Sequence, residues 1–597
     1  MPTHNSRIFE FWKELKRRNV VRVITVYAGA AFVILELVDI ITEPFGLPVW
    51  TLILAAVILS VGFVILVIVS WIYDIHPQRG VVKTEPDDKL EASDSSKSSN
   101  SWKIATYISF IVIAGLIAIN LFGGKKHVEI DESLEKSIAV LPIHNLSGDD
   151  TQDHICMGIT DEIISHLFKV RSFEEVRSFT SVQPFIESQE SIKEIAQKLH
   201  VNYILAGTFK RMGDDLRITA QLIETKSDNP IWLEDYDLPY HEVIGIPPEI
   251  ALQIANHLKA FISEDEQQRI ETIPTENLEA YQYYMLGKSQ LYGKERDAEL
   301  WQAVEYYQGA LSEDPSFALA HSGLAEVYMR LTTLAIAPPE EAYRIAKASA
   351  LKALSLDNGL ANPHCMLALT KVYFEYDFDA AEEEFMRALE IDSRSFEAHL
   401  YYSVFLTMMG RHDEALAHIN LAIEIDPFST LAEERKINIL YFAGNISEAL
   451  EAIEKFTDSH PNNPGGFSKR AVYYSQLGRY EEAISMLNIQ IELMGENNIS
   501  DEIGLRGYAY GKLGQKARAL EHLDELDMLS TKGYYISPRT RVWIYLGIDE
   551  TEAALEILNK TFDDNIFDPV YFRRYPREYA QHDPGFIELQ KKVGLIE

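Results

Sequence analysis

Residues whose types could do catalytic chemistry are present, but they do not stand at the spacings that catalysis requires. The chain has no P-loop G-x-x-x-x-G-K-[ST], no G-x-S-x-G elbow, no H-E-x-x-H and no EF-hand loop. Its 17 histidines are scattered, and in the closest group, His144, His154 and His166, nothing is paired at metal-ligand spacing. Two cysteines, Cys156 and Cys365, exclude a disulfide framework and a cysteine-rich metal site, and they leave any redox role open. We therefore predict a non-enzymatic protein with no catalytic residue, no metal site and no cofactor.

Recognition of a partner is the chemistry that the second half of the chain favours. Tyrosine gives rigid contact area, and carboxylates bind basic groups. Counted along the helices expected there, the side chains that face a common groove are Glu397, Glu434, Asn438, Tyr441, Asp501 and Tyr508. For any single one of them a solvated face that only keeps the protein soluble is favoured over a binding role, because few interface positions carry most of the binding energy.

Two acidic residues, Glu36 and Asp39, interrupt a long apolar stretch near the amino terminus. An acidic side chain at the centre of a membrane costs about 2.5–3.5 kcal/mol, so it marks a contact with another span or a proton-sensitive switch. The alternative is that both lie near the outer end of a span and reach interfacial water. This alternative is favoured for Asp39, and for Glu36 both remain open.

The predicted groove residues belong to a region of internal repeats. A small residue is followed by a bulky one four positions later, usually by a small one three further on, and then by a helix breaker, as in Ala415, Ile419, Ala422 and Pro427. The leading alanines are separated by 43, 35, 34, 34, 34, 36 and 35 residues; they are Ala303, Ala346, Ala381, Ala415, Ala449, Ala483, Ala519 and Ala554. This is the period of tetratricopeptide repeats, in which alanine lets two antiparallel helices approach closely.

We predict an all-α tetratricopeptide solenoid of about eight repeats over residues 271–597. Gly410, Gly444, Gly478 and Gly514 each stand five residues before the next alanine, where a glycine caps the first helix of a repeat in the left-handed conformation. The first helices of such repeats line a concave groove that binds partners. The amphipathic tail over residues 583–597 is expected to cap the last repeat.

Ahead of the repeats, residues 127–270 alternate between short strands and amphipathic helices. The run SIAVLPI from Ser137 is a buried strand followed by turn residues, and GITDEIISHLFK from Gly158 is a helix with one apolar face. A short strand over 175–177 and a helix over 191–199 follow. Residues 203–224 form a hairpin around Gly213, and IWLEDYD adds another strand before a helical stretch. We predict an α/β domain here.

The order of these motifs resembles the TolB amino-terminal or FlgO-like domain. The resemblance rests on SIAVLPI-x-NLSGD, GITDEIISHL, EIAQKLHVNYILAGTFKR, LRITAQLIE and IWLEDYD, with Ile143 and His144 standing where such sequences often have phenylalanine. It implies an α/β fold with binding or sensing roles and no catalysis. Domains of this family occur in CadC-type transmembrane regulators and in several tetratricopeptide proteins, and relatives with this architecture can carry a nucleotide cyclase.

The first 126 residues contain three apolar stretches, over 20–41, 49–73 and 104–122, each long enough to cross a membrane as a helix. We predict a membrane anchor of three transmembrane helices over residues 1–126, with a linker at 74–103. Eleven basic residues at the amino terminus and in the linker, against two beyond the third span, place both segments in the cytoplasm. Everything after residue 122 would then be periplasmic, in the inner membrane of a Gram-negative bacterium. Residues 11–50 also resemble a two-span module found ahead of bacterial sensor and repeat proteins.

The net charge of −35 divides unevenly between these parts. Residues 1–126 carry 13 basic and 11 acidic residues, whereas residues 127–597 carry 42 basic and 79 acidic residues, a net charge of −37. Nucleic acid is therefore excluded as a partner, since binding it requires a basic surface. A basic protein or peptide is favoured instead.

Together these features predict a multidomain, non-enzymatic scaffold or sensor that is anchored in the inner membrane and presents an α/β domain and a repeat groove to a protein partner. The alternative is a transmembrane signalling subunit that relays ligand binding outside the cell to a cytoplasmic enzyme or regulator. The sequence does not fix the oligomeric state and allows a homo-oligomer.

Overall fold

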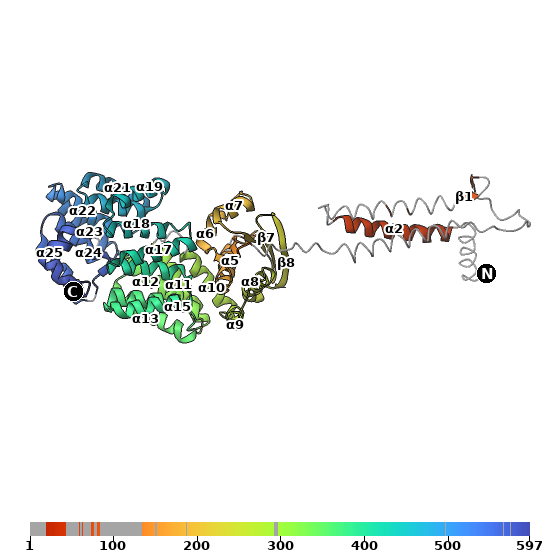
Figure 1. The fold of residues 1–597 in the computed structure, drawn as a ribbon, viewed down its shortest axis with the longest axis horizontal. Helices are drawn as coiled ribbons and strands as arrows, with labels where there is room; N and C mark the ends of the chain where they lie inside the picture. Colours follow the sequence, from red (N-terminus) through yellow and green to blue (C-terminus); the bar gives the residue numbers. More distant parts are fainter. Residues whose placement is uncertain are drawn as a thin grey trace, which may run out of the picture. The chain divides into compact units, whose positions relative to one another are not determined.

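The computed structural model describes residues 20–42, 59, 63, 73–76, 80–83, 134–149, 152–186, 188–291, 297–495, 497–564, 566–572 and 575–596. The chain divides into two compact units, Met1–Val128 and Glu129–Glu597 (Figure 1). The first unit contains helix α2 (Val20–Thr42) and an antiparallel hairpin of β1 (Tyr73–His76) and β2 (Gly80–Lys83). The Tyr27 hydroxyl in α2 donates to the carbonyl oxygen of Leu59 at 2.7 Å.

The prediction of three membrane-spanning helices is wrong. Helix α2 coincides with the first predicted span, 20–41, but no helix in the described part of the chain is long and apolar enough to cross a membrane. Three charged residues, Arg22, Glu36 and Asp39, interrupt the apolar sequence of α2, and each is costly in a lipid core. The same finding contradicts the predicted location, which was an inner membrane with the residues after 122 in the periplasm.

Several predictions for the first unit fall on residues outside the described ranges. Of the second and third predicted spans, 49–73 and 104–122, only Leu59, Phe63 and Tyr73 are described. The predicted linker at 74–103 contains most of the β1–β2 hairpin. The side chains of Glu36 and Asp39 also lie outside the described residues, so their predicted role stays a prediction.

A mixed sheet forms the centre of the α/β part of the second unit. Its strand order is β5-β3-β6-β7-β8, and β4 pairs with β6. Strands β5, β3 and β6 are parallel, whereas β6, β7 and β8 are antiparallel. The strands are β3 (Ser137–Val140), β4 (His144–Asn145), β5 (Glu175–Val176), β6 (Tyr203–Met212), β7 (Asp215–Glu224) and β8 (Asn229–Pro239). The strand predicted from Ser137 stops at Val140, shortly before Pro142, which has no backbone N–H to donate to a neighbouring strand.

Five helices belong to the same domain. They are α5 (Asp153–Phe168), α6 (Phe179–Val182), α7 (Ile192–Leu199), α8 (Ile246–His257) and α9 (Glu264–Glu271), with 3-10 turns at Gln183–Phe185 and Tyr240–Gly245. Helices α5, α6 and α7 pack on strands of the sheet, α8 packs on α5, and α9 packs on α8. Helix α7 begins with a capping box in which Ser191 and Glu194 satisfy each other's backbone amides. The helix predicted over 191–199 and the hairpin predicted over 203–224 are both confirmed.

Antiparallel helix pairs make up the rest of the second unit (Figure 1). The helices are α10 (Leu278–Leu291), α11 (Asp297–Glu313), α12 (Ala318–Thr333), α13 (Pro339–Leu356), α14 (Asn362–Thr370), α15 (Phe378–Ile391), α16 (Phe396–Met408), α17 (His412–Ile425), α18 (Thr430–Phe442), α19 (Ile446–Ser459), α20 (Pro464–Gln476), α21 (Tyr480–Met494), α22 (Ser500–Lys512), α23 (Lys516–Thr531), α24 (Pro538–Gly547) and α25 (Thr551–Asp563). A π-helical turn, η4 (Lys371–Glu375), extends α14, and α26 (Pro569–Phe572), α27 (Arg577–His582) and α28 (Pro584–Val593) end the chain.

The repeating alanines lie where the helices of a pair touch, and all eight of them are fully buried. In the first pair the bulky residue of the repeat, Tyr307, fills the space between α10 and α12. A Cβ at Gly287 would lie 2.9 Å from the Tyr307 ring and a Cβ at Gly323 only 2.4 Å from it, so the ring fits because both positions are glycine.

The turns inside the middle repeats use the glycines expected from the sequence. Gly410, Gly444, Gly478 and Gly514 have φ values of 78°, 94°, 73° and 77°. This left-handed conformation ends the first helix of each pair and favours glycine. The predicted role of these glycines is confirmed.

The α/β domain and the solenoid share one apolar core, which runs from Ile138 to Leu595. Helix α5 packs directly on α10, so closely that a Cβ at Gly158 would lie 1.9 Å from the sulfur of Met285. The α/β domain is therefore joined to the first repeats by packing as well as by the chain.

Polar contacts hold the α/β domain to the turns that precede α16 and α18. The guanidinium of Arg394 donates to the carbonyl oxygens of Phe173 and Phe168 at 2.7 Å each and to that of Val170 at 3.1 Å. These carbonyls lie at the end of α5 and in the loop after it, where helix carbonyls lack intrahelical partners. A single arginine of the solenoid thus binds the carboxyl end of a helix in the other domain.

A second set of contacts lies one repeat further along. Asp426 accepts hydrogen bonds from the hydroxyls of Ser181, at 2.6 Å, and Thr180. Arg177 donates to the carbonyl oxygen of Glu424 at 2.6 Å. The first part of α6 and the turn before it are therefore fixed against the end of α17.

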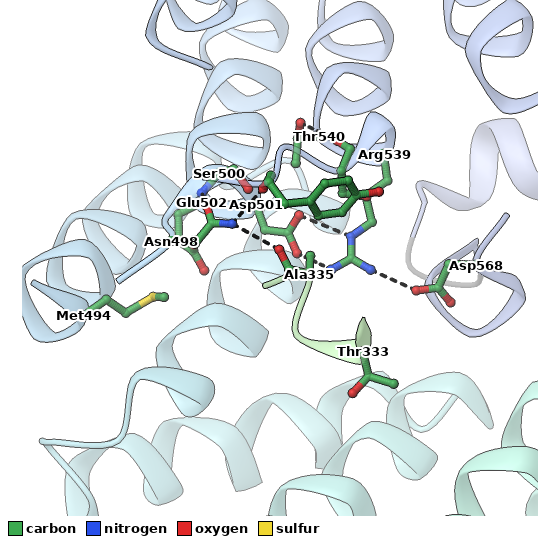
Figure 2. Close-up of polar contacts among 12 residues, drawn as sticks. Thr333, Ala335, Met494, Asn498, Ser500, Asp501, Glu502, Arg539, Thr540 and Asp568 are labelled. Atoms are coloured by element: carbon green, nitrogen blue, oxygen red, sulfur yellow. Dashed lines mark hydrogen bonds and ion pairs between the residues drawn. The ribbon is translucent and has the colours of Figure 1, made fainter. Parts of the chain in front are cut away.

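The early and late repeats also touch each other. The Asn498 side-chain amide, in the turn before α22, donates to the carbonyl oxygens of Tyr535, at 2.8 Å, and of Ala335, at 3.1 Å, in the turn after α12 (Figure 2). The Asn498 backbone amide donates to a carboxylate oxygen of Asp297 at 3.2 Å, and the Asp297 backbone amide donates to the Asn497 side chain at 3.3 Å. The row of repeats thus closes on itself through contacts between residues that are about 160–200 positions apart.

Candidate functional site

A cluster of charged side chains lies where α5 meets the inner helices of the first repeats. Asp161 and Glu162 stand side by side in α5, and both are at least nine-tenths buried. Lys288 in α10 forms ion pairs with Asp161 and, at 3.5 Å, with Glu162. This half of the cluster therefore combines two carboxylates with one ammonium group.

The other half comes from three neighbouring inner helices, α12, α14 and α16. Arg330 pairs with Glu326 within α12 at 2.9 Å, and the Asn362 amide in α14 donates to the other oxygen of Glu326 at 3.0 Å. Glu397 in α16 is half-buried, and the negative charges of Glu326 and Asp161 both act on its carboxylate. We call these residues the concave cluster: Asp161, Glu162, Lys288, Glu326, Arg330, Asn362 and Glu397.

The electrostatics of the concave cluster show an excess of negative charge at Glu397. Burial first, and then the charge of Glu326, raise the pKa of Glu397 to about 7, although Arg330 opposes this. Burial also raises the pKa of Glu162, against the influence of Lys288. A positive group placed beside Glu397 would remove the repulsion between carboxylates and favour the charged form.

A histidine next to the cluster is kept neutral. Burial, and then the charges of Lys169 and Lys288, lower the pKa of His166 to about 3. Its Nδ1 lies 3.2 Å from the ammonium group of Lys169. At neutral pH this imidazole accepts a hydrogen bond and adds no charge to the cluster.

The arrangement suits recognition of a basic group better than covalent chemistry. Burial raises the pKa of the Cys156 thiol to about 12 and that of the Cys365 thiol well above its ordinary value, so neither is a nucleophilic thiolate at neutral pH. Among the described residues no group of three histidine, cysteine or acidic side chains could hold a metal ion. Carboxylates that are close together and partly shielded from water bind ammonium and guanidinium groups well.

Of the other residues predicted to face the groove, three lie on α18, and each has a partner on α20. Glu434 is buried and forms an ion pair with Lys469. The side-chain oxygen of Asn438 accepts a hydrogen bond from the Tyr473 hydroxyl at 2.6 Å. Tyr441 is 3 % exposed and stacks on the Tyr473 ring, with centroids 4.1 Å apart. These three side chains join neighbouring repeats.

The last two predicted residues, Asp501 and Tyr508, lie on α22. Asp501 forms an ion pair with Arg539 at 2.6 Å, and Arg539 also pairs with Asp568 at 2.8 Å (Figure 2). Tyr508 is 2 % exposed and packs edge to face against Trp543. The structure therefore does not bring the six predicted residues into one site, and Glu397 alone belongs to the concave cluster.

The end of the chain covers another part of the inner surface. Helix α26 packs against α16 and η4, and the Tyr376 hydroxyl after η4 exchanges hydrogen bonds with the backbone of Phe567 at 3.2 and 3.0 Å. Val570 of α26 lines a small cavity of about 40 Å³ together with Asn438 and Arg435 of α18. The carboxyl-terminal segment therefore lies against α16 and α18 here.

Sequence reasoning missed most of the concave cluster because its members stand on elements assigned to different domains. Asp161 and Glu162 belong to the α/β domain, and Lys288 and Glu326 to the repeats. One signal was available in the sequence GITDEIISHL. Two adjacent acidic residues in a helix that is otherwise buried need partners, and those partners come from another element.

Family models match two parts of the chain. Residues 134–246 match the second domain of HilA/YgeH-like transcriptional regulators. Residues 375–430 and 435–488 match the tetratricopeptide repeat, so these repeats, predicted from the alanine period, are confirmed. The resemblance to TolB amino-terminal domains stays a prediction.

Several curated proteins match part of the chain, including the following two. The candidate adenylate cyclase 3 of Rhizobium meliloti (strain 1021) is 29 % identical over 189 residues, which are 32 % of this chain and 32 % of the relative. Transcriptional regulator HilA of Salmonella typhimurium (strain LT2) is 24 % identical over 298 residues, 50 % of this chain and 53 % of the relative. The chain thus spans about a third to about a half of the length of these relatives.

Solved structures of repeat proteins are also similar. A tetratricopeptide repeat protein from Parabacteroides merdae ATCC 43184 is 16 % identical, covers 45 % of this chain and 98 % of its own, and has a TM-score of 0.32.

Proposed function

We propose that the chain is a non-enzymatic interaction scaffold that binds a basic protein or peptide at the concave cluster. One observation carries the proposal: Glu397 is half-buried and its carboxylate is under the negative charges of Glu326 and Asp161, while Arg330, which opposes them, is already paired with Glu326. A lysine or arginine side chain of a partner would supply the missing positive charge. A charge-assisted contact of this kind is stronger in a partly shielded site than on an open surface.

Three further features support the proposal. Tetratricopeptide repeats, which use their inner helices to bind protein partners, are present. The acidic charge of residues 127–597 attracts basic molecules over a distance of several ångströms. The resemblance of the α/β domain to TolB amino-terminal domains implies binding or sensing.

The test uses the full chain and a set of short peptides that carry a photoreactive cross-linker beside a lysine, an arginine or a glutamine. We expect the lysine and arginine peptides to cross-link to α12, α14 and α16, and the glutamine peptide to do so weakly. Their affinity should rise between pH 6 and pH 8, because Glu397 loses its proton near pH 7. Cross-links elsewhere only, or equal yields from all three peptides, would refute the proposal.

A pair of matched variants completes the test. Glu397→Gln removes the carboxylate and should weaken binding by about tenfold, equivalent to about 1.4 kcal/mol. Glu383→Gln makes the same change at an exposed position on α15, in the outer row of helices, and should leave binding unchanged. Equal binding by the two variants would contradict the role of Glu397.

A regulatory role is a second candidate, favoured by the match of residues 134–246 to a domain of HilA/YgeH-like regulators. Asp161 belongs to α5 and its charge acts on Glu397, so a partner that binds Glu397 would also change the electrostatic surroundings of the α/β domain. Hydrogen exchange of amides 168–177, with and without a bound peptide, tests this idea. A change in the exchange of these amides supports coupling between the two domains. Unchanged exchange contradicts coupling, and the interaction scaffold then remains as the proposed function.

A further inference from the structure

Strand β8 forms one edge of the sheet, and β5 forms the other. Strand β8 is the last in the strand order and pairs only with β7 among the described strands. Such an edge presents unpaired amide and carbonyl groups, on which another extended segment can add as a strand.

The backbone direction of β8 follows from the residue after it. The Tyr240 amide donates to the carbonyl oxygen of Asp214, next to the start of β7. Because backbone groups of an antiparallel strand alternate between its two sides, Asp237 and Asp235 direct their amides and carbonyls away from β7. Pro239, which has no backbone N–H, ends this row of outward-facing backbone groups.

A cleft of about 560 Å³ follows the same edge, between β8, the start of α8 and residues 273–276. Its lining includes five carboxylates, of Asp235, Asp237, Glu242, Glu249 and Glu276, and neither lysine nor arginine. Two of the five are partly neutralised on the sheet surface, since Asp237 pairs with Arg217 at 2.6 Å and Asp235 accepts a hydrogen bond from Thr219. Of the other three, Glu242 lies 3.8 Å from Nε2 of His241, which also lines the cleft, and all three can attract positive charge.

The cleft also contains a polar group without a hydrogen bond. Tyr236 lines the cleft and is 7 % exposed, and its hydroxyl makes no hydrogen bond to any described residue, although Glu234 is near. One carboxylate oxygen of Glu234 accepts a hydrogen bond from the Trp232 indole at 3.2 Å. A buried hydroxyl without a partner is costly, so a ligand that offers it a hydrogen bond gains free energy.

Apolar surface lies beside these polar groups. Ile273 is 48 % exposed at the rim, and Leu238 and Ile244 contribute to the lining. Burial, and then the charge of Glu234, raise the pKa of Glu249, and the lining contains no lysine or arginine to oppose this. A ligand with alternating basic and apolar side chains matches both properties.

We propose that this cleft, which we call the β8 cleft, binds an extended basic peptide segment that adds to the open edge of β8 as a further strand. Main-chain hydrogen bonds to Asp235 and Asp237 fix the segment, and its lysine or arginine side chains lie against Glu242, Glu249 and Glu276. The site uses none of the residues of the concave cluster, so it goes beyond the function proposed above.

The test measures binding of a labelled peptide, acetyl-KVKVKVK-amide, to the full chain by fluorescence anisotropy. We expect saturable binding that weakens at high salt, since exposed charges are screened beyond about 10 Å at 0.1 M ionic strength. The peptide EVEVEVE should not bind. A third peptide, KVKVKVK with N-methyl groups on alternate backbone amides, should bind at least tenfold more weakly, because it cannot complete the strand pairing.

Two variants of equal charge identify the place of binding. The triple variant Glu242→Gln, Glu249→Gln, Glu276→Gln should weaken binding at least tenfold. The matched control neutralises three acidic residues of α9 in the same domain, Glu264→Gln, Asp265→Asn and Glu271→Gln, and should bind like the parent chain. The thermal unfolding of both is followed by circular dichroism to show that they are folded.

Each of the following three outcomes would overturn the proposal. No binding of KVKVKVK means that the acidic residues and Pro239 only protect the edge from aggregation. Equal binding of the methylated peptide excludes strand addition. If Glu397→Gln abolishes binding and the cleft variant does not, the peptide binds the concave cluster, and the β8 cleft is refuted while the proposed function stands.

Discussion

The contact of Arg394 with the α/β domain allows a quantitative prediction. Its guanidinium donates three hydrogen bonds to the backbone carbonyls of Phe168, Val170 and Phe173. We replace it by methionine, Arg394→Met, which keeps the length of the apolar stem and removes all three donors.

The expected cost follows from the number and kind of bonds. A hydrogen bond that involves a charged group contributes about 1.5–3 kcal/mol, so three bonds at the lower value give about 4.5 kcal/mol. Arg394 is partly exposed, and water can replace part of what is lost. We therefore expect the free energy of opening of the segment around residues 168–176 to fall by about 3 kcal/mol.

Hydrogen exchange read by mass spectrometry measures this local opening. A loss of about 3 kcal/mol corresponds to exchange that is faster by about a hundredfold. The matched control is Arg387→Met, at an exposed position of α15, which should leave exchange at 168–176 unchanged. An effect of Arg394→Met below about 1 kcal/mol, or one equal to that of the control, would show that this arginine does not hold the domains together.

Three further predictions concern buried polar groups of the solenoid. Burial raises the pKa of Glu502 to about 8, above its value of about 4.5 in the unfolded chain, so the stability contributed by the protonated acid is complete below pH 4.5 and lost as the pH rises through 8. Glu502→Gln should therefore unfold at a higher urea concentration than the parent at pH 9 and at a similar one at pH 4; a parallel pH profile would contradict this. Asn498→Ala removes the hydrogen bond to Ala335 and should cost about 1–2 kcal/mol, with faster exchange of amides 335–337; unchanged exchange there would mean that the repeats do not close. Lys469→Met leaves the buried Glu434 without its ion-pair partner and should cost about 3–5 kcal/mol in thermal unfolding, most of which Lys469→Met/Glu434→Leu should recover; a double variant no better than the single one would refute the pairing argument.

The solenoid was predictable because its packing rule is local. Alanine at one position and a bulky residue four positions later lie on the same face of a helix, so the contact between the helices of a pair can be predicted from the sequence. Gly410 and the three equivalent glycines mark the turns for an equally local reason, since they adopt a positive φ that other residues avoid. In the α/β domain the hairpin around Gly213 follows from the same rule.

The candidate site was less predictable because it depends on contacts between distant elements. Helical periodicity places Tyr441 on the inner face of its helix, but it does not reveal that Tyr473 of the next repeat covers it. Nor does it reveal that α5 lies against α10 and adds Asp161 to the surroundings of Glu397. The prediction of membrane spans used hydropathy, which takes only the length and composition of an apolar stretch into account. No described helix is long and apolar enough to cross a membrane.

The contact between the turn after α12 and the turn before α22 has a consequence for how the protein is made. A row of repeats whose members touch only their neighbours can fold from its amino-terminal end while the ribosome is still adding residues. Here Asp297 and Ala335 find their partners only after Asn497 and Asn498 have left the ribosome. The first repeats therefore complete their contacts late, and a chain truncated before α22 is destabilised at its beginning as well as at its cut end. Newly synthesised chains would expose the turns that contain Asp297 and Ala335 to chaperones and proteases until the later repeats have been synthesised.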